Sequence, residues 1–160
     1  MQIIETLVLE QHEGLFDILS GFLALDFIDE LDVPVFRLEI DPELVILIYK
    51  LNAEQQVRNE LLDNIFPHLK SVIIASERDS FGEWNFTPAI SERLNTLEGE
   101  AAVILALEQS KDLMEKSPDY IIENGFSLGK RSRLLFWNPE NKDSIKKVWK
   151  IAWGDLLKSS

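Results

Sequence analysis

Six carboxylates between residues 26 and 41 are the side chains whose type and spacing best suit a binding or catalytic role. They are Asp26, Asp29, Glu30, Asp32, Glu39 and Asp41. Clustered carboxylate oxygens can bind a hard divalent cation, and on a surface they attract a basic partner. The cluster lacks the bend glycine and the closing glutamate of an EF-hand loop. A binding surface is therefore the preferred interpretation, and a divalent-cation-dependent enzyme that uses clustered carboxylates is the alternative.

Side chains for acid–base or nucleophilic catalysis are scarce. A two-carboxylate site needs one buried carboxyl group, and strand alternation places Glu39, the best candidate, on the solvent side. The two histidines, His12 and His68, stand far apart and neither belongs to a metal-binding spacing. The chain has no cysteine, which excludes disulfides, thiolate metal sites and a cysteine nucleophile. No catalytic residue, cofactor or metal is predicted.

Glycine-rich phosphate-binding motifs are also missing. The sequence contains neither G-x-x-x-x-G-K-[ST] nor G-x-G-x-x-G. The segment Gly125–Lys130 is similar to a phosphate loop only in composition, because no clear strand precedes it and no helix follows it. We interpret its glycines as turn residues.

Three aromatic residues stand in one polar segment, at Phe81, Trp84 and Phe86. Aromatic side chains in a loop either fold back onto the core or anchor a partner, because tryptophan and phenylalanine provide much contact area. Both interpretations remain open. In the second, Phe81 and Trp84 join the acidic residues in the predicted partner-binding site.

Basic residues and tryptophans alternate near the end of the sequence. The cations are Lys130, Arg131, Arg133, Lys142, Lys146, Lys147 and Lys150. Such a pattern can hold single-stranded nucleic acid by phosphate contacts and stacking, so a nucleic-acid or scaffold subunit is a further alternative. However, Trp149 and Trp153 share a helical face with Ile145, which predicts a core position for both rings and a solvated face for the lysines.

Strands must position these residues. Residues 3–25 fit either one long helix or a strand over Ile3 to Leu9 followed by a helix from Glu13. Phe36, Leu38 and Ile40 alternate with polar residues, and the apolar run from Leu44 to Tyr49 follows. This pattern predicts an antiparallel hairpin whose second strand is central. Further strands are predicted at residues 71–76 and 133–137, with a hairpin turn at Asn124-Gly125.

Helices are predicted at residues 52–67, 88–94, 97–116 and from 138 onward. Asn52 and Asn138 are the expected N-caps of the first and last, and the third surrounds the apolar run Ala101–Leu107. Strands and helices do not alternate regularly along the sequence. The predicted fold class is therefore α+β, a mostly antiparallel sheet of about four to six strands with helices packed on it. Residues 1–160 are predicted to form a single domain.

The charge distribution is one-sided. The chain has a net charge of -12, with eleven carboxylates and one basic side chain, Arg37, before Lys50. The overall field repels DNA and anionic membranes. The start of the sequence lacks a basic signal-peptide region, and the apolar runs are shorter than a membrane span, so a cytoplasmic location is expected.

These features favour a non-catalytic, acidic protein-binding module. The chain is similar in type, although in no specific motif, to bacterial immunity and antitoxin proteins, which neutralise a cationic toxin such as a nuclease. That likeness implies a basic protein partner, no DNA or membrane contact, and recognition through the acidic residues and Trp84. The oligomeric state is left open.

Overall fold

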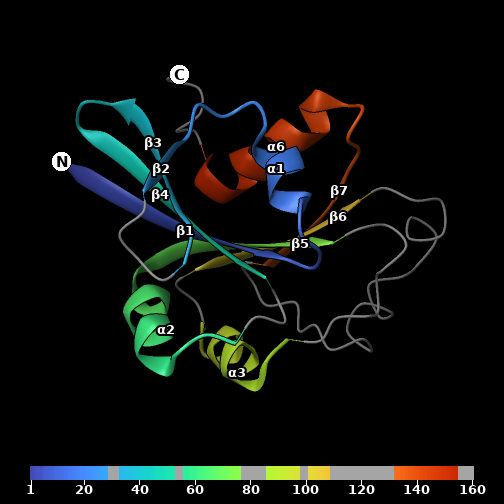
Figure 1. Cartoon of the computed structure of the whole chain (residues 1–160). Helices are drawn as coiled ribbons and strands as arrows, with labels where there is room; N and C mark the ends of the chain where they lie inside the picture. The colour runs from blue at the N-terminus through green and yellow to red at the C-terminus, as the bar shows by residue number, and fades with distance from the viewer. Residues whose placement is uncertain (29–32, 53–55, 77–85, 98–100, 109–131, 155–160) are drawn as a thin grey trace.

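The structure, a computed structural model, describes residues 1–28, 33–52, 56–76, 86–97, 101–108 and 132–154. Within these residues, a central sheet of seven strands carries helices on both of its faces (Figure 1). The strand order is β2-β3-β4-β1-β5-β6-β7. In this fold the first helix (Leu15–Ser20) and the last helix (Lys142–Trp153) lie against each other.

The elements alternate between strand and helix more regularly than the sequence suggested. In chain order they are β1 (Gln2–Glu10), α1 (Leu15–Ser20), β2 (Asp26–Ile28), β3 (Val35–Asp41), β4 (Leu44–Asn52), α2 (Asn59–Ile65), the 3-10 helix η1 (Phe66–His68), β5 (Leu69–Ser76), α3 (Pro88–Thr96), β6 (Ala102–Glu108), β7 (Ser132–Trp137) and α6 (Lys142–Trp153).

Five strands of the sheet run parallel, and β1 is the central strand of all seven. It pairs in parallel with β4 on one side, where Val8 is opposite Lys50, and with β5 on the other, where Val8 is opposite Ile73. Strands β6 and β7 continue the parallel arrangement. Only β2 and β3 are antiparallel to their neighbours, and they form one edge of the sheet.

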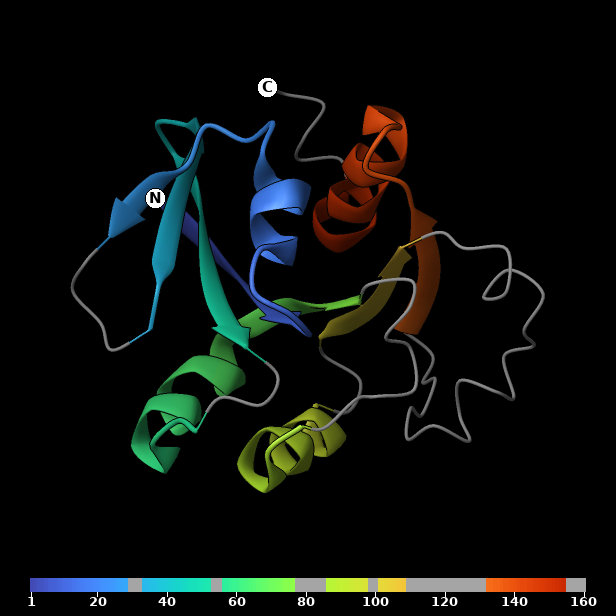
Figure 2. The same ribbon diagram turned by 45° about the vertical axis from the view of Figure 1, so that its right-hand side comes forward.

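Helices cover the two faces in pairs, so the molecule has three layers (Figure 2). Helices α1 and α6 pack on one face together with Val8 of β1, and α2 and α3 pack on the other together with Leu7 and Leu9. Because successive side chains of a strand point to opposite faces, a strand covered on both sides must be apolar at nearly every position. The middle of β1 meets this condition.

The predicted fold class is wrong: the sheet is mostly parallel, has seven strands and alternates with helices, which makes the protein α/β. The main error was the run Ala101–Leu107, which lies almost entirely in strand β6 (Ala102–Glu108) and is not the centre of a helix over residues 97–116. Ile104 packs against the α1–α6 side and Leu105 against the α2–α3 side. A strand buried on both faces has no period-2 pattern, so its apolar run is easily mistaken for a buried helix.

Several strands agree with the prediction. The first 25 residues form a strand followed by a helix, which is one of the two alternatives that the sequence left open, and β3 and β4 form the predicted antiparallel hairpin with β4 inside the sheet. Strands β5 and β7 and a helix beginning at Pro88 also lie where they were expected. The turn predicted at Asn124-Gly125 lies outside the described residues.

Both predicted asparagine caps are wrong. Asn52 is the last residue of β4, opposite Glu10, and α2 begins seven positions later at Asn59. Asn141, and not Asn138, caps α6 by accepting the backbone N–H groups of Asp143 and Ser144. The buried stripe of α6, which includes Trp149 and Trp153, agrees with the prediction. Among the described helices, none is long and apolar enough to cross a membrane.

Candidate functional site

The carboxyl ends of the parallel strands lie side by side along one end of the sheet. Ligands of open α/β sheets bind outside the carboxyl ends of the strands, at the point where successive connections go to opposite faces. In this protein that point lies beside β1, because α1 and α2 cover opposite faces. We call this place the β1 corner and define it by Glu10, Gln11, Phe16, Lys50 and Ser76.

Glu10 occupies the centre of the β1 corner. Its side chain is 3% exposed, and its Oε2 accepts a hydrogen bond from the backbone N–H of Phe16 at 2.9 Å. Gly14, the residue before α1, provides no side-chain cap. The first N–H groups of a helix have no partner within the helix. The Glu10 carboxylate accepts one of them and so acts as the helix cap.

Lys50 provides the opposite charge. Its Nζ lies 3.4 Å from Oε1 of Glu10 and 5.7 Å from the centre of the Phe16 ring. Each carboxylate oxygen of Glu10 therefore has its own donor. A buried carboxylate is costly unless it is paired and hydrogen-bonded, and this arrangement satisfies both needs. Lys50 can reach Glu10 because the register of β1 and β4 places Lys50 opposite Val8, two residues before Glu10.

Gln11 and Ser76 close the neighbouring part of the corner. The hydroxyl of Ser76, the last residue of β5, donates to Oε1 of Gln11 at 2.7 Å, and the backbone N–H of Gln11 donates to the carbonyl oxygen of Ala75 at 3.0 Å. Both side chains are buried. The polar groups at the end of β1 are therefore bound to one another inside the protein.

The exposed part of the corner is acidic and has one imidazole. His12 and Glu13 follow Gln11 and are both exposed. His12 is therefore in a loop and not on the apolar helical stripe that one interpretation of the sequence gave it. Within the described segments, no three of the histidine, aspartate and glutamate side chains come close enough to hold a metal ion.

A second polar pair lies on the opposite face of the sheet. The Tyr49 hydroxyl donates a hydrogen bond to Oε1 of Glu5. Burial raises the pKa of the Tyr49 hydroxyl well above its usual value, and the hydrogen bond and negative charge of Glu5 raise it further. Because Tyr49 packs with the residues beneath α2 and α3, this pair is not part of the β1 corner.

The residues predicted to bind a partner do not gather at this corner. Asp26 and Glu39 are exposed on β2 and β3, and Glu39 pairs with Arg37 at 3.3 Å. Asp41 accepts the backbone N–H of Glu43 in the hairpin turn. The other predicted residues lie outside the described part of the chain: Asp29, Glu30, Asp32, Phe81 and Trp84. Phe86, from the same aromatic segment, packs against the core beneath α2 and α3.

The sequence did contain a signal for Glu10 that was overlooked. A glutamate directly after the buried run from Leu7 to Leu9, and shortly before a glycine and an apolar pair, is an unusual end for a central strand. Its partner could not be found in the same way. Lys50 is forty residues away, and only the parallel register of β1 and β4 brings it near.

Comparison with known proteins gives a fold. No family model and no curated protein matches the chain. Among solved structures, it is similar to an ADP-ribosylation-factor-like GTP-binding protein, the small COPII coat GTPase SAR1 of Encephalitozoon cuniculi, in complex with GDP. The TM-score is 0.64 at 10% sequence identity, over 97% of this chain and 80% of the other. The chain has the fold of a small GTPase.

This small-GTPase fold corrects the functional interpretation. The likeness to immunity and antitoxin proteins rested on acidity and size, and the fold contradicts it. Net charge describes what a surface attracts and does not determine a fold, so it could not identify the class of protein. A basic partner remains a prediction that no observation here tests.

Proposed function

We propose that this protein is a domain of small-GTPase fold that works without nucleotide and keeps one fixed conformation. The observation that carries the proposal is the Glu10 carboxylate at the amino end of α1. In P-loop proteins the turn between a strand and the following helix holds nucleotide phosphates by backbone N–H groups and a lysine. In this chain the strand that leads into the corresponding turn ends in an anion, Glu10, which is bound to the Phe16 N–H and to Lys50.

Electrostatics supports this proposal. A phosphate placed about 4 Å from the Glu10 carboxylate would be repelled by about 4 kcal/mol at an effective dielectric constant near 20. Glu10 is held in place, because moving it would break its ion pair with Lys50 and leave the Phe16 N–H without its acceptor. The residues between β1 and α1, Gln11 to Gly14, contain one glycine and no lysine, whereas a phosphate loop needs two glycines and a lysine.

A fixed conformation follows from the same feature. In GTPases the γ-phosphate and its Mg²⁺ order the switch segments, which relax after hydrolysis. A domain that holds a carboxylate at the phosphate position has no such cycle, and the internal Glu10–Lys50 pair keeps the corner in one state. The protein then acts as a non-hydrolytic scaffold through its surface.

Titration with fluorescent GDP and GTP in the presence of Mg²⁺ tests the proposal. We expect no saturable binding up to about 1 mM nucleotide and no increase in the thermal midpoint. At about 1 mM nucleotide, a Kd of about 10 μM would stabilise the folded state by about 2.7 kcal/mol, so binding of that strength would be visible in the thermal midpoint. Saturable binding of either nucleotide would overturn the proposal.

Nucleotide binding is the second candidate, and the likeness to a GDP complex favours it. It requires the phosphates to be held by groups other than the β1 corner. The same titration on Glu10→Ala separates the two candidates. If the Glu10 carboxylate is the obstacle, the wild type binds neither nucleotide and removal of the carboxylate makes binding appear, whereas a nucleotide that binds elsewhere is bound equally by both proteins.

A further inference from the structure

Strand β2 is short and lies at the edge of the sheet (Figure 1). It has three residues, and among the described strands it pairs with β3 alone, where Phe27 is opposite Phe36. Strand β3, in contrast, is paired on both sides, with β2 and with β4. So short a strand, bound on one side, depends on its side-chain contacts to stay in place.

Three phenylalanine rings connect β2 with the β1 corner, and we call them the aromatic row. The ring centroids of Phe27 and Phe36 are 5.4 Å apart, and those of Phe36 and Phe16 are 4.9 Å apart. Phe27 is 59% exposed, Phe36 is half-buried and Phe16 is 1% exposed. Ring pairs at such separations attract each other beyond the effect of the area that they bury. The row therefore runs from solvent at the sheet edge to a fully packed ring.

The β1 corner fixes the buried end of the aromatic row. Oε2 of Glu10 accepts the Phe16 backbone N–H at 2.9 Å, and Oε1 lies 3.4 Å from Lys50 Nζ, which is 5.7 Å from the centre of the Phe16 ring. Glu10 thus holds Phe16 by its backbone and, through Lys50, by its ring. Because contacts to a charged group are stronger than those to a neutral one, loss of the Glu10 charge weakens both. Phe36 then packs against a ring that is no longer fixed.

We propose that the β1 corner keeps β2 attached to the sheet through the aromatic row, so that β2 protects the sheet edge. If β2 detaches, β3 becomes the edge strand, and its unpaired backbone groups are open to another strand. Glu10 is a positioning residue in this device, because it acts on β2 through Phe16 and Phe36. The inference rests on the fixed corner of the proposed function, and its test contains no nucleotide, so that failure of either one is seen separately.

Amide hydrogen exchange of the whole chain, followed residue by residue by NMR, tests the inference. Glu10→Gln keeps the size of the side chain and removes its charge. We expect the amides of residues 26–28 to exchange about 3- to 30-fold faster in this variant, which is the usual strength of coupling through packed side chains. Edge strands exchange by local opening, so this readout reports attachment of β2 and not global stability.

Removal of the middle ring tests whether the aromatic row carries the effect. Phe36→Leu keeps an apolar side chain on β3 and leaves the Glu10–Lys50 pair in place, and it should also speed exchange at residues 26–28. In this background Glu10→Gln should add less than about a twofold further increase, because the connection is already broken. If the corner acted on β2 by another route, Glu10→Gln would have the same effect with and without the Phe36 ring.

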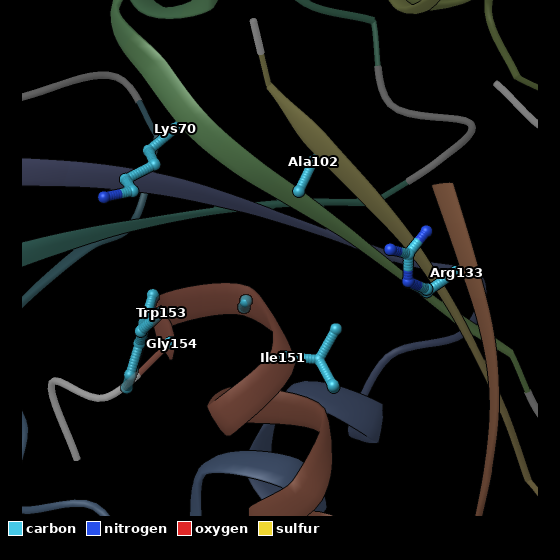
Figure 3. Close-up of a pocket in the computed structure, with 7 residues that line it drawn as sticks. Lys70, Ala102, Arg133, Ile151, Trp153 and Gly154 are labelled. Atoms are coloured by element: carbon cyan, nitrogen blue, oxygen red, sulfur yellow. The ribbon is translucent and has the colours of Figure 1, made fainter. Parts of the chain in front are cut away.

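Three variants provide controls. Glu13→Ala removes an exposed carboxylate of the corner, and Leu105→Ala lowers global stability from the opposite face of the sheet. Ile151→Ala removes a 39% exposed apolar side chain that lines a hollow at the amino ends of β5, β6 and β7 (Figure 3). All three should leave exchange at residues 26–28 unchanged. The inference fails if Glu10→Gln does the same, if Leu105→Ala speeds this exchange as much as Glu10→Gln, or if loss of the Phe36 ring does not reduce the Glu10→Gln effect.

Discussion

The indole Nε1 of Trp153 donates a hydrogen bond over 2.9 Å to the hydroxyl oxygen of Thr6. The Thr6 hydroxyl is in turn hydrogen-bonded to that of Ser71 at 3.0 Å, and all three side chains are buried. The last helix is thereby joined to the two central strands β1 and β5 by polar groups within an apolar layer. Such groups are costly to leave unpaired, so each depends on the others.

We expect Trp153→Phe to lower the free energy of unfolding by about 1–3 kcal/mol, because the ring is shortened and the Thr6 hydroxyl loses its donor. Urea unfolding measures this change. In Thr6→Val the indole loses its acceptor instead. The double variant should then show a coupling energy of at least about 0.5 kcal/mol, whereas strictly additive effects would contradict the hydrogen bond.

The ion pair of the β1 corner makes the second prediction. Glu10→Ala should destabilise the fold by about 2–4 kcal/mol, because it leaves Lys50 partly buried beside no carboxylate and the Phe16 N–H without an acceptor. Glu13→Ala is the matched control, since Glu13 is an exposed carboxylate of the same corner. It should change stability by no more than about 0.5 kcal/mol. Equal effects of the two variants in denaturant unfolding would show that Glu10 has no special role.

Alkaline pH tests the Tyr49–Glu5 pair. The pKa of Tyr49 is raised in the folded state, so the folded protein holds this proton more tightly than the unfolded chain. The resulting stabilisation is present below the usual tyrosine pKa of about 10 and is lost as the pH rises above it. The free energy of unfolding should therefore fall between pH 9 and pH 11 by up to about 1.4 kcal/mol more in the wild type than in Tyr49→Phe.

The Tyr49 comparison removes the titration of lysines, which both proteins share. Tyr120→Phe, at the chain's other tyrosine, shows what loss of an arbitrary tyrosine does to the pH profile. If the profile of Tyr49→Phe runs parallel to that of the wild type over the same range, the pKa of Tyr49 is not raised by folding.

Strand β6 gives a prediction that depends on the corrected fold. Ile104 is completely buried against α1 and α6, so Ile104→Ala should cost about 2–5 kcal/mol of unfolding free energy. Ile3→Ala removes the same atoms from a side chain of β1 that is 51% exposed, and its cost should stay near or below about 1 kcal/mol. Similar midpoints for the two variants in urea would place Ile104 outside the core.

Local patterns in the sequence were sufficient for the elements that have one wet face. The alternation of Phe36, Leu38 and Ile40 and the stripe of α6 gave the right structures because solvent on one side imposes a period. Local patterns failed at β6, because both of its faces are covered by helices and its apolar residues show no periodicity. The parallel pairing of β1 with β4 and β5 also could not be predicted, since it depends on helices α1 and α2 crossing to opposite faces.

The candidate site was harder to predict from the sequence than the fold. Acidity directed attention to exposed carboxylates such as Glu39, whereas the carboxylate that shapes the β1 corner, Glu10, is buried. Its structural role depends on its contacts with the Phe16 N–H and with Lys50. The contact with Lys50 can be recognised only once the β1–β4 register is known. Composition cannot distinguish a carboxylate that faces water from one that is enclosed.

The position of β1 in the sheet has a consequence for how the chain reaches its native state. Every element that β1 contacts follows it in the sequence, and its two strand partners, β4 and β5, begin only at Leu44 and Leu69. During synthesis β1 is therefore an apolar segment without a strand partner until β4 has emerged, and it is paired on both sides only after β5 has followed. Assembly of the sheet must wait for distant pairings, which slows folding and leaves the apolar side chains of β1 exposed in the meantime.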